Sequence, residues 1–161
     1  SRAVVKYMLY AEQAKSECYM WLGEVFDNTA LNELAHARVV VRTFLRIIGT
    51  TLDNLKDSLA GETNEYENLY KEFQETAERE GFTQIAKFYK ELREVEESHA
   101  RAFKDFIDKL EDGTMFEGPV ESKWYCMNCG YIYEGSEAPA VCPLCGYPRG
   151  YFKQYCEITN L

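Results

Sequence analysis

Four cysteines near the C-terminal end of the sequence form two Cys-x-x-Cys pairs, Cys126/Cys129 and Cys142/Cys145. Gly-Tyr follows each pair, and a short segment separates the two pairs. This spacing is typical of a four-thiolate metal site, in which glycine turns let backbone N–H groups point at the sulfurs. The alternative is a pair of disulfides in a secreted module. We favour a metal, because the four cysteines lie in one short segment and no export signal is present.

A second pattern combines glutamates with both histidines of the chain. Glu33-Leu-Ala-His36-Ala-Arg resembles Glu96-Glu-Ser-His99-Ala-Arg. Side chains three residues apart lie about 60° apart around a helix and one turn along it, so each motif can aim two ligands at one point. One glutamate from each of two helices and a Glu-x-x-His from each of two others form a di-iron carboxylate site. The candidate ligands are Glu12, Glu33, His36, Glu62, Glu65, Glu96 and His99.

The simpler interpretation is that these glutamates only solvate helix faces, as most of the 27 acidic residues would. A single Glu-x-x-His is also weak support for a metal site. However, the chain has only two histidines, and both stand three positions after a glutamate and just before Ala-Arg. Five glutamates inside an apolar bundle would repel one another unless cations were bound. We therefore predict a di-metal site.

The segments that carry these ligands predict a mainly α protein with two parts. Residues 1–111 contain no proline, and apolar residues recur there every three to four positions. All four prolines lie at position 119 or beyond. The tail is too small to fold on a core alone, so the metal must stabilise it. We predict helices at 2–25, 30–48, 62–79 and 83–110, and three regions: a four-helix bundle (1–111), a linker (112–122) and a small metal-bound β module (123–161).

Composition excludes several classes of protein. The chain has 161 residues, 46% of them apolar, a net charge of −9 and a pI of about 4.8. An acidic chain is a poor nucleic-acid binder, and no run of 18 apolar residues could span a membrane. Charged residues near the start of the chain argue against a signal peptide, and we expect a cytoplasmic protein. Two further cysteines lie outside the Cys-x-x-Cys pairs. We interpret Cys18 as a small buried residue and assign Cys156 no role.

Nearly the whole chain resembles the rubrerythrin family, in which a ferritin-like bundle precedes a rubredoxin-like module. In the helical part, the resemblance rests on Glu12 with Tyr19, on Ala60-Gly61-Glu62-x-x-Glu65-Tyr66, on Glu80-Gly81-Phe82-x-x-Ile85-Ala86 and on the two Glu-x-x-His motifs. In the tail it rests on Trp124-Tyr-Cys126-Met-Asn-Cys129-Gly and Ala138-Pro139-x-Val141-Cys142-Pro-Leu-Cys145-Gly. Either part alone would be less specific, since Cys-x-x-Cys pairs also build zinc ribbons.

The resemblance implies a role for each ligand. Glu33 and Glu96 match the bridging carboxylates, Glu62 and His99 match terminal ligands of one iron, and Glu12 matches a terminal ligand of the other. Glu65 would hold this second iron when it is oxidised and His36 when it is reduced, since carboxylate suits ferric iron and imidazole suits ferrous iron. Tyr19 and Tyr70 match tyrosines that hydrogen-bond to the ligands. With an iron on the four cysteines, three iron ions are expected.

The resemblance also implies an activity: a peroxidase that reduces hydrogen peroxide to water in defence against oxidative stress. The tetrathiolate iron would deliver single electrons to the two-iron site. They would come from rubredoxin or a rubredoxin reductase-type donor, and ultimately from a separate NAD(P)H-dependent reductase, because the chain has no GxGxxG. Two other interpretations stay open: a ferroxidase, iron-storage or electron-transfer protein, and a zinc-stabilised scaffold without catalysis.

We further expect a homodimer or higher oligomer. The tail follows one end of a long helix, whereas the ligands lie near the middle of the bundle. A neighbouring subunit's tail could therefore approach the di-iron site more easily than the chain's own.

The first pair of helices departs from the pattern of the second. The chain between Glu12 and Glu33 is shorter than the chain between Glu62 and Glu96, by about 20 Å if both are helical. The only turn signal in the shorter segment is Asp27-Asn28-Thr29, and a turn there leaves the two carboxylates about 15 Å out of level.

We considered two explanations for this difference. Either an elbow between Phe26 and Ala30, long enough to make up the difference, is absent from the chain, which we favour, or two chains exchange helices. In the second case each site takes Glu12 from one chain and Glu33 from the other.

Overall fold

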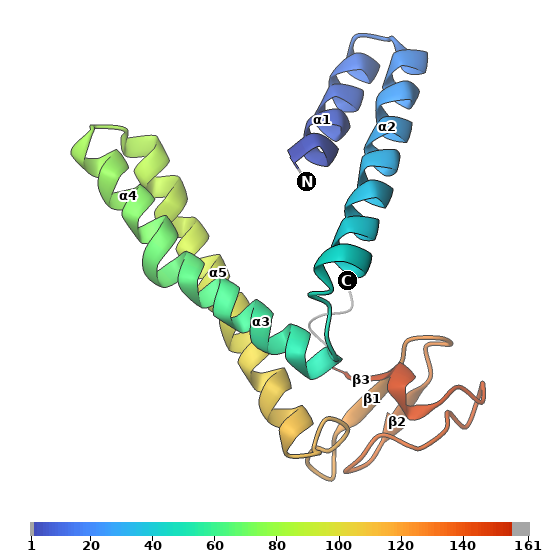
Figure 1. The fold of residues 1–161 in the computed structure, drawn as a ribbon. Helices are drawn as coiled ribbons and strands as arrows, with labels where there is room; N and C mark the ends of the chain where they lie inside the picture. Colours follow the sequence, from blue (N-terminus) through green and yellow to red (C-terminus); the bar gives the residue numbers. More distant parts are fainter. Residues whose placement is uncertain (1, 156–161) are drawn as a thin grey trace. The chain divides into compact units, whose positions relative to one another are not determined.

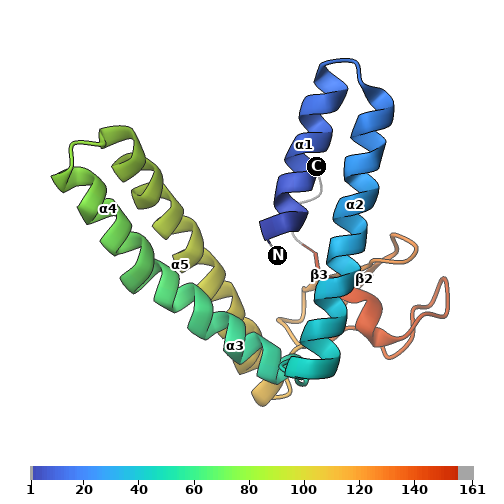
Figure 2. The same cartoon turned by 45° about the horizontal axis from the view of Figure 1, so that its top comes forward.

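The computed structural model describes residues 2–155, which form a mainly helical fold with a small C-terminal antiparallel sheet (Figures 1 and 2). This confirms the predicted fold class. The chain divides into two compact units, residues 1–54 and residues 55–161. Cys156 lies outside the described residues. None of the helices within residues 2–155 is long and apolar enough to cross a membrane.

The first unit is a helical hairpin. Helix α1 (Arg2–Ser16) packs antiparallel to α2 (Met20–Val39), which continues as the π-helical segment η1 (Val40–Leu45). Small residues, Ala11 and Ala14 on α1 and Gly23 and Ala30 on α2, are buried between the helices. Their size allows the two backbones to approach closely.

The turn predicted at Asp27–Thr29 is wrong, because α2 runs unbroken through these residues. The Thr29 hydroxyl donates to the Val25 carbonyl, and Lys15 forms an ion pair with Asp27 at 2.6 Å, so both polar side chains are satisfied within the hairpin. The chain turns instead at residues 17–19. An elbow inserted between Phe26 and Ala30 would interrupt this continuous helix.

The second unit contains a longer hairpin. Helix α3 (Thr51–Asn64), the π-helical segment η2 (Glu65–Leu69) and α4 (Tyr70–Arg79) follow one another without a break. They turn at Gly81 into α5 (Thr83–Glu111), so the helix predicted at 83–110 is confirmed, whereas the helix predicted at 62–79 begins earlier, at Thr51. At the other end of the hairpin, Lys56 pairs with Glu111.

The C-terminal module is built on a three-stranded antiparallel sheet of order β2-β1-β3. Its strands are β1 (Lys123–Cys126), β2 (Ile132–Glu134) and β3 (Phe152–Gln154), with the 3₁₀ turn η3 (Arg149–Tyr151) before β3. Its core consists of the buried residues Trp124, Cys126, Ala138, Cys142 and Phe152. Phe116, from the stretch expected as a linker, packs against this core. The division of the chain at 111 and 123 stays a prediction.

Candidate metal centres

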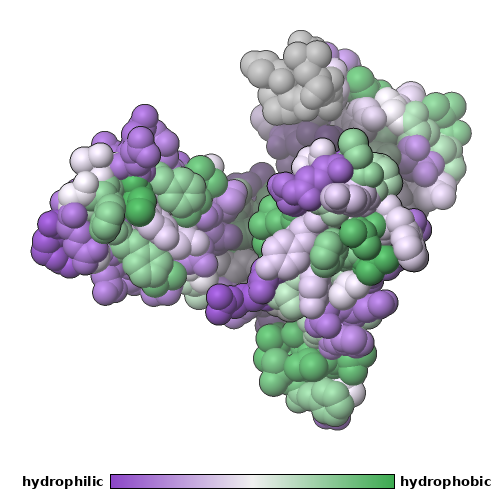
Figure 3. All heavy atoms as spheres, turned by 90° about the horizontal axis from the view of Figure 1, so that it is seen from above, coloured by the Kyte–Doolittle hydropathy of each residue, from purple (hydrophilic) through white to green (hydrophobic). Residues whose placement is uncertain are grey.

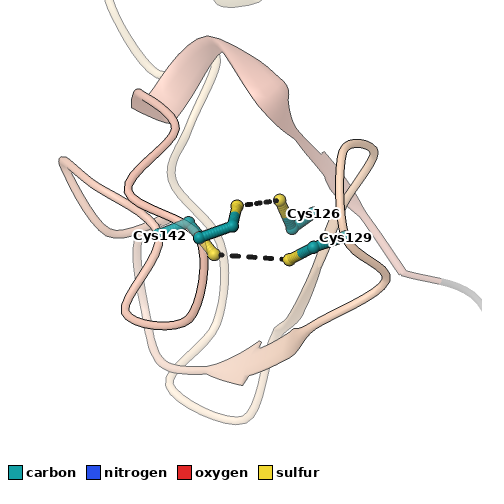
Figure 4. Close-up of side chains that lie close together, drawn as sticks. Cys126, Cys129 and Cys142 are labelled. Carbon is teal, nitrogen blue, oxygen red and sulfur yellow. Dashed lines mark hydrogen bonds between the residues drawn. The ribbon is translucent and has the colours of Figure 1, made fainter.

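The four cysteines of the module converge as predicted (Figure 4). Cys126 Sγ lies 3.8 Å from Cys145 Sγ, and Cys129 Sγ lies 3.7 Å from Cys142 Sγ. A tetrahedral ion with metal–sulfur bonds of about 2.3 Å sets its sulfurs about 3.8 Å apart. The observed separations therefore fit a tetrathiolate metal site.

Two equivalent loops hold these sulfurs. Gly130 and Gly146 have φ angles of 79° and 75°, a conformation that side chains disfavour, and their N–H groups bond back to the carbonyls of Cys126 and Cys142. The N–H that follows each glycine then points at the second cysteine of its pair, Tyr131 at Cys129 and Tyr147 at Cys145. These bonds favour a thiolate, the form that binds metal.

The thiols of this cluster differ in acidity. The Asn128 side chain and the Tyr147 N–H lower the pKa of Cys145 to about 6. The Tyr131 N–H lowers the pKa of Cys129, but burial and the neighbouring thiols outweigh it and raise that pKa to about 12. Cys145 thus ionises first, and Cys129 needs a bound cation to lose its proton near neutral pH.

A second group of ligands forms within the longer hairpin, where α3 and α5 lie side by side. His99 Nδ1 is 2.8 Å from Glu96 Oε2 and 3.5 Å from Glu62 Oε2. Ligand atoms about 2.1 Å from one ion lie about 3.0 to 3.4 Å apart at neighbouring coordination positions. This group therefore fits one metal ion, and it unites three of the predicted ligands.

The electrostatics of this group favour a cation. Burial raises the pKa of Glu62, and a hydrogen bond and charge repulsion from Glu96 raise it further, against the opposing effect of His99. Glu62 therefore holds a proton more tightly than an isolated glutamate does. A divalent ion in the same place would replace that proton.

Glu65, at the start of η2, is not one of the three clustered ligands, whereas Tyr70, which follows η2, is close enough to Glu96 for its charge to act on the phenol. The Tyr70 hydroxyl donates a hydrogen bond to the Glu65 carboxylate. Burial, this bond and the charges of Glu65 and Glu96 raise the pKa of Tyr70 to about 12. The phenol is therefore protonated at every physiological pH and can act as a donor.

The first hairpin carries the other predicted motif. Glu33 and His36 lie on α2, with His36 Nδ1 3.8 Å from Glu33 Oε1 and both side chains open to solvent. They form no metal group with Glu12 among residues 2–155.

The turns of the two hairpins have the same hydrogen bonds. These bonds show which residue of the first hairpin corresponds to which residue of the second. Tyr19 N–H bonds to the Ala14 carbonyl and Cys18 N–H to that of Lys15, the pattern that ends many helices. The same two bonds recur in the second hairpin, at Phe82 and Gly81. Cys18, with φ 66°, occupies the left-handed position that Gly81 holds at φ 81°. It is exposed in this turn, so its interpretation as a small buried residue is wrong.

The packing of aromatic rings confirms this match of Cys18 with Gly81. In the first hairpin, Tyr7, Tyr10 and Phe26 lie within 5.6 to 6.3 Å of one another, measured between ring centroids. The equivalent residues of the second hairpin, Tyr70, Phe73 and Tyr89, lie within 5.2 to 6.3 Å. Glu33 and His36 are equivalent to Glu96 and His99 by the same offset.

This alignment changes the interpretation of Glu12. Its equivalent is Glu75, an exposed residue of α4, and not Glu62. Because the rings of Tyr10 and Phe26 pack at the same level, Glu12 lies about 14 Å out of level with Glu33. The hairpin therefore does not let Glu12 and Glu33 share an iron.

The shorter spacing from Glu12 to Glu33 now has a simple cause. Glu33 and Glu96 stand equally far beyond their turns, whereas Glu12 is much closer to its turn than Glu62 is. The position equivalent to Glu62 would lie ahead of Ser1. The absent elbow and the exchange of helices were inferred only from comparing Glu12 with Glu62, so neither is needed.

A tyrosine assignment also changes. Tyr19 lies in the turn and is 58% exposed, about 21 Å along the helix from Glu33, so the hairpin keeps it away from the ligands. Tyr7 is the residue equivalent to Tyr70, and sequence reasoning missed it. The offset between the two Glu-x-x-His motifs would have found it, because the same offset from Tyr70 leads to a tyrosine.

Helical hairpins with carboxylate–histidine ligands and a module with a four-cysteine site define a protein built to hold non-haem metal. Known sequences identify the family. The model described as "Rubrerythrin" matches residues 53–128, and "Rubrerythrin, rubredoxin-like domain" matches residues 124–153. The rubrerythrin of Porphyromonas gingivalis is 38% identical over 95% of this chain and 82% of its own length.

Two more similarities were found. The rubrerythrin of Nitratidesulfovibrio vulgaris is 33% identical over 95% of this chain and 86% of its own. A solved structure of nigerythrin in a mixed-valent state covers 95% of this chain and 79% of its own at 25% identity, with a TM-score of 0.39. On the sequence matches, the chain belongs to the rubrerythrin family.

Proteins of this family are oxidoreductases, generally related to oxidative stress, that combine di-iron and rubredoxin-type centres. The four-cysteine site fits the tetrathiolate iron of such a protein, and the group of Glu62, Glu96 and His99 fits one side of its di-iron centre.

Proposed function

We propose that this protein is a peroxidase that reduces hydrogen peroxide to water with electrons relayed through the tetrathiolate iron. The observation that carries the proposal is the presence, in one chain, of a complete four-thiolate site and a carboxylate–histidine group. A store of iron or a zinc scaffold has no need of a one-electron site beside a carboxylate site.

The proposed di-iron ligands come from both hairpins. Glu62, Glu65, Glu96 and His99 come from the second, and Glu33 and His36 come from the first, where they occupy the positions equivalent to Glu96 and His99. The redox-dependent exchange of Glu65 for His36 is part of this proposal. Glu12 is left out of the set, because its equivalent in the second hairpin is the exposed Glu75.

Reduction of hydrogen peroxide consumes two electrons and two protons and yields two water molecules. The di-iron centre, when bound, supplies the two electrons. The chain's own residues would manage the protons. Tyr70 stays protonated and donates to Glu65, and the raised pKa of Glu62 favours its protonated form. The carboxylates can therefore accept and pass protons as the charge at the site changes.

The module would refill the site one electron at a time. Its four sulfurs lie within 4.8 Å of one another, and two of their separations, 3.8 and 3.7 Å, match a tetrahedral site, so the ligands need little movement. We propose rubredoxin or a rubredoxin reductase-type protein as donor, supplied by a separate NAD(P)H-dependent reductase.

We also propose a homodimer or a higher oligomer, in the cytoplasm. Neither hairpin covers its own apolar surface: in the first, Trp21 is 78% exposed, and in the second, Phe88 is 57% exposed. Patches of hydrophobic surface are visible on the molecule in Figure 3. Such patches mark surfaces that pack against other helices.

Rapid mixing of the reduced protein with peroxide and, separately, with oxygen tests the proposal. We expect peroxide to reoxidise both centres at least about a hundredfold faster than oxygen at equal concentration. In Cys129→Ser the ferric thiolate absorption should vanish, the first turnover should remain and steady-state turnover should fail. Preferential reaction with oxygen, with iron retained as ferric mineral, would instead indicate a ferroxidase.

A further inference from the structure

The helix that carries Glu65 contains a break in its normal hydrogen bonding. The N–H of Tyr70 donates to the carbonyl of Glu65, five positions back, which is the π-helical spacing. In an α-helix that N–H would donate to the carbonyl of Tyr66. The Tyr66 carbonyl has therefore lost its usual backbone donor.

A side chain from the facing helix supplies a donor in its place. Arg93, on α5, donates from Nε to the Tyr66 carbonyl at 2.8 Å, and from Nη1 to Gln74 Oε1 on α4 at 3.0 Å. Both bonds are partly buried. The planar guanidinium thus links Tyr66, inside η2, to Gln74, which lies about two helical turns further along the chain.

The π-helical turn has a direct effect on the ligands. Side chains five positions apart in an α-helix lie about 140° apart around its axis, which would place Glu65 and Tyr70 on different faces. The wider turn of η2 brings them closer to the same face, where the Tyr70 hydroxyl meets the Glu65 carboxylate. Any change of η2 to α-helix would pull these two side chains apart.

The first hairpin offers a natural comparison. The residue equivalent to Arg93 is Ala30, which has no donor and is buried between the helices. Helix α1, which packs against it, is α-helical over its described length, Arg2–Ser16. Of the two hairpins, only the one with the arginine has a π-helical segment in its first helix.

We propose that Arg93 is a positioning residue: its forked hydrogen bonds hold η2 in the π-helical form and thereby fix the Glu65 carboxylate and the Tyr70 hydroxyl beside the metal group. It touches no reacting atom itself. The part concerning metal rests on the proposed function, in which Glu65 is a ligand, whereas the part concerning η2 does not.

The test uses the full chain with Arg93→Met, which keeps an apolar stem and removes every donor. The matched control is Arg101→Met, on the same helix, where the arginine is 71% exposed and pairs only with Glu97 at 3.7 Å among its described contacts. Backbone hydrogen exchange is measured on peptides that contain residues 66–71. The Co²⁺ spectrum of the helical site is measured after Zn²⁺ has filled the module.

We expect exchange at residues 66–71 to rise at least about tenfold in Arg93→Met, and Co²⁺ to bind about tenfold more weakly with an altered visible spectrum. Arg101→Met should match the wild type in both. Arg93→Lys, which keeps the charge but cannot form the fork, should fall between them, and it serves if Arg93→Met does not fold. Wild-type exchange and wild-type Co²⁺ spectra in both Arg93 variants would overturn the proposal.

The two proposals fail separately. If the wild type does not turn over peroxide but Arg93→Met still shows faster exchange and a changed spectrum, the proposed function is wrong and the role of Arg93 stands. If the wild type turns over peroxide and both Arg93 variants equal it in exchange and spectrum, the role of Arg93 is wrong and the function stands.

Discussion

The two helical hairpins share a turn and a Glu-x-x-His motif, yet among the described residues only the second one assembles a metal group by itself. From turn to motif their second helices are equal in length, and their aromatic rings pack alike. They differ in the first helix. In the second hairpin this helix reaches back about 28 Å from the turn to Glu62, whereas in the first, Glu12 stands only about 9 Å before the turn. A Glu-x-x-His motif therefore forms a ligand group within its own hairpin only if that hairpin brings the opposite carboxylate level with it.

The largest effect should follow the loss of the carboxylate at the centre of the second hairpin. In Glu96→Ala we expect peroxide turnover to fall on the order of 100-fold or more, because the residue meets both Glu62 and His99. Thiolate absorption should be unchanged. The control is Glu75→Ala, an exposed position on α4. Equal turnover in Glu96→Ala and Glu75→Ala would contradict the assigned site.

The two equivalent tyrosines, Tyr7 and Tyr70, should differ in their effect on peroxide turnover. Tyr70→Phe removes the donor to Glu65, and we expect peroxide turnover to slow about tenfold. In Tyr7→Phe we expect less than about a threefold change, because the residue equivalent to Glu65 is Arg2 and offers no carboxylate. Turnover rates of both variants, measured with the same donor, check this. If Tyr7→Phe slowed turnover more than Tyr70→Phe, this prediction would be wrong.

Both hairpins turn at a residue with positive φ, so Cys18→Gly and Gly81→Ala should change the free energy of unfolding in opposite directions. Cys18 holds the left-handed conformation that glycine adopts without strain, so Cys18→Gly should stabilise its hairpin by about 1 kcal/mol. Gly81→Ala should destabilise the other hairpin by a similar amount. Thermal unfolding followed by circular dichroism should show shifts of about 2 to 4 °C in opposite directions. A loss of stability in Cys18→Gly would mean that the turn is placed incorrectly.

The smallest effect should come from Glu12. In Glu12→Gln we expect iron content and peroxide turnover within about twofold of the wild type, because this residue is equivalent to the exposed Glu75. Glu33→Gln, in the same hairpin, should lower turnover on the order of 100-fold. If Glu12→Gln lost iron as Glu33→Gln does, Glu12 would be a ligand and the alignment of the repeat would be wrong.

Sequence reasoning succeeded where the ligands are close together in the chain. The four cysteines meet because two short loops of the same kind hold them, and glycine at the left-handed positions makes both loops visible in the sequence. Glu96 and His99 meet because they are one turn apart on one helix. Both predictions depend on spacing over a short stretch of chain.

Prediction from the sequence failed where a conformation is not indicated by the residue types. The first hairpin turns at Cys18, a residue that rarely adopts a positive φ, while the stronger turn signal at Asp27–Thr29 is overridden by packing of Phe26 against Tyr7 and Tyr10. Tyr7 was missed for the same reason, since its role follows only from the position of the turn. Nothing in the sequence announces the π-helical segment η2, whose bonds depend on Arg93 of another helix.

The central claim is that one chain holds a tetrathiolate iron and a di-iron centre with oxygen and nitrogen ligands. Mössbauer spectroscopy of the protein reconstituted with ⁵⁷Fe tests it most directly. The account predicts that about one third of the iron has thiolate parameters and about two thirds belongs to a spin-coupled pair with carboxylate and histidine ligands. Thiolate iron alone, or oxygen-ligated iron without spin coupling, would contradict it.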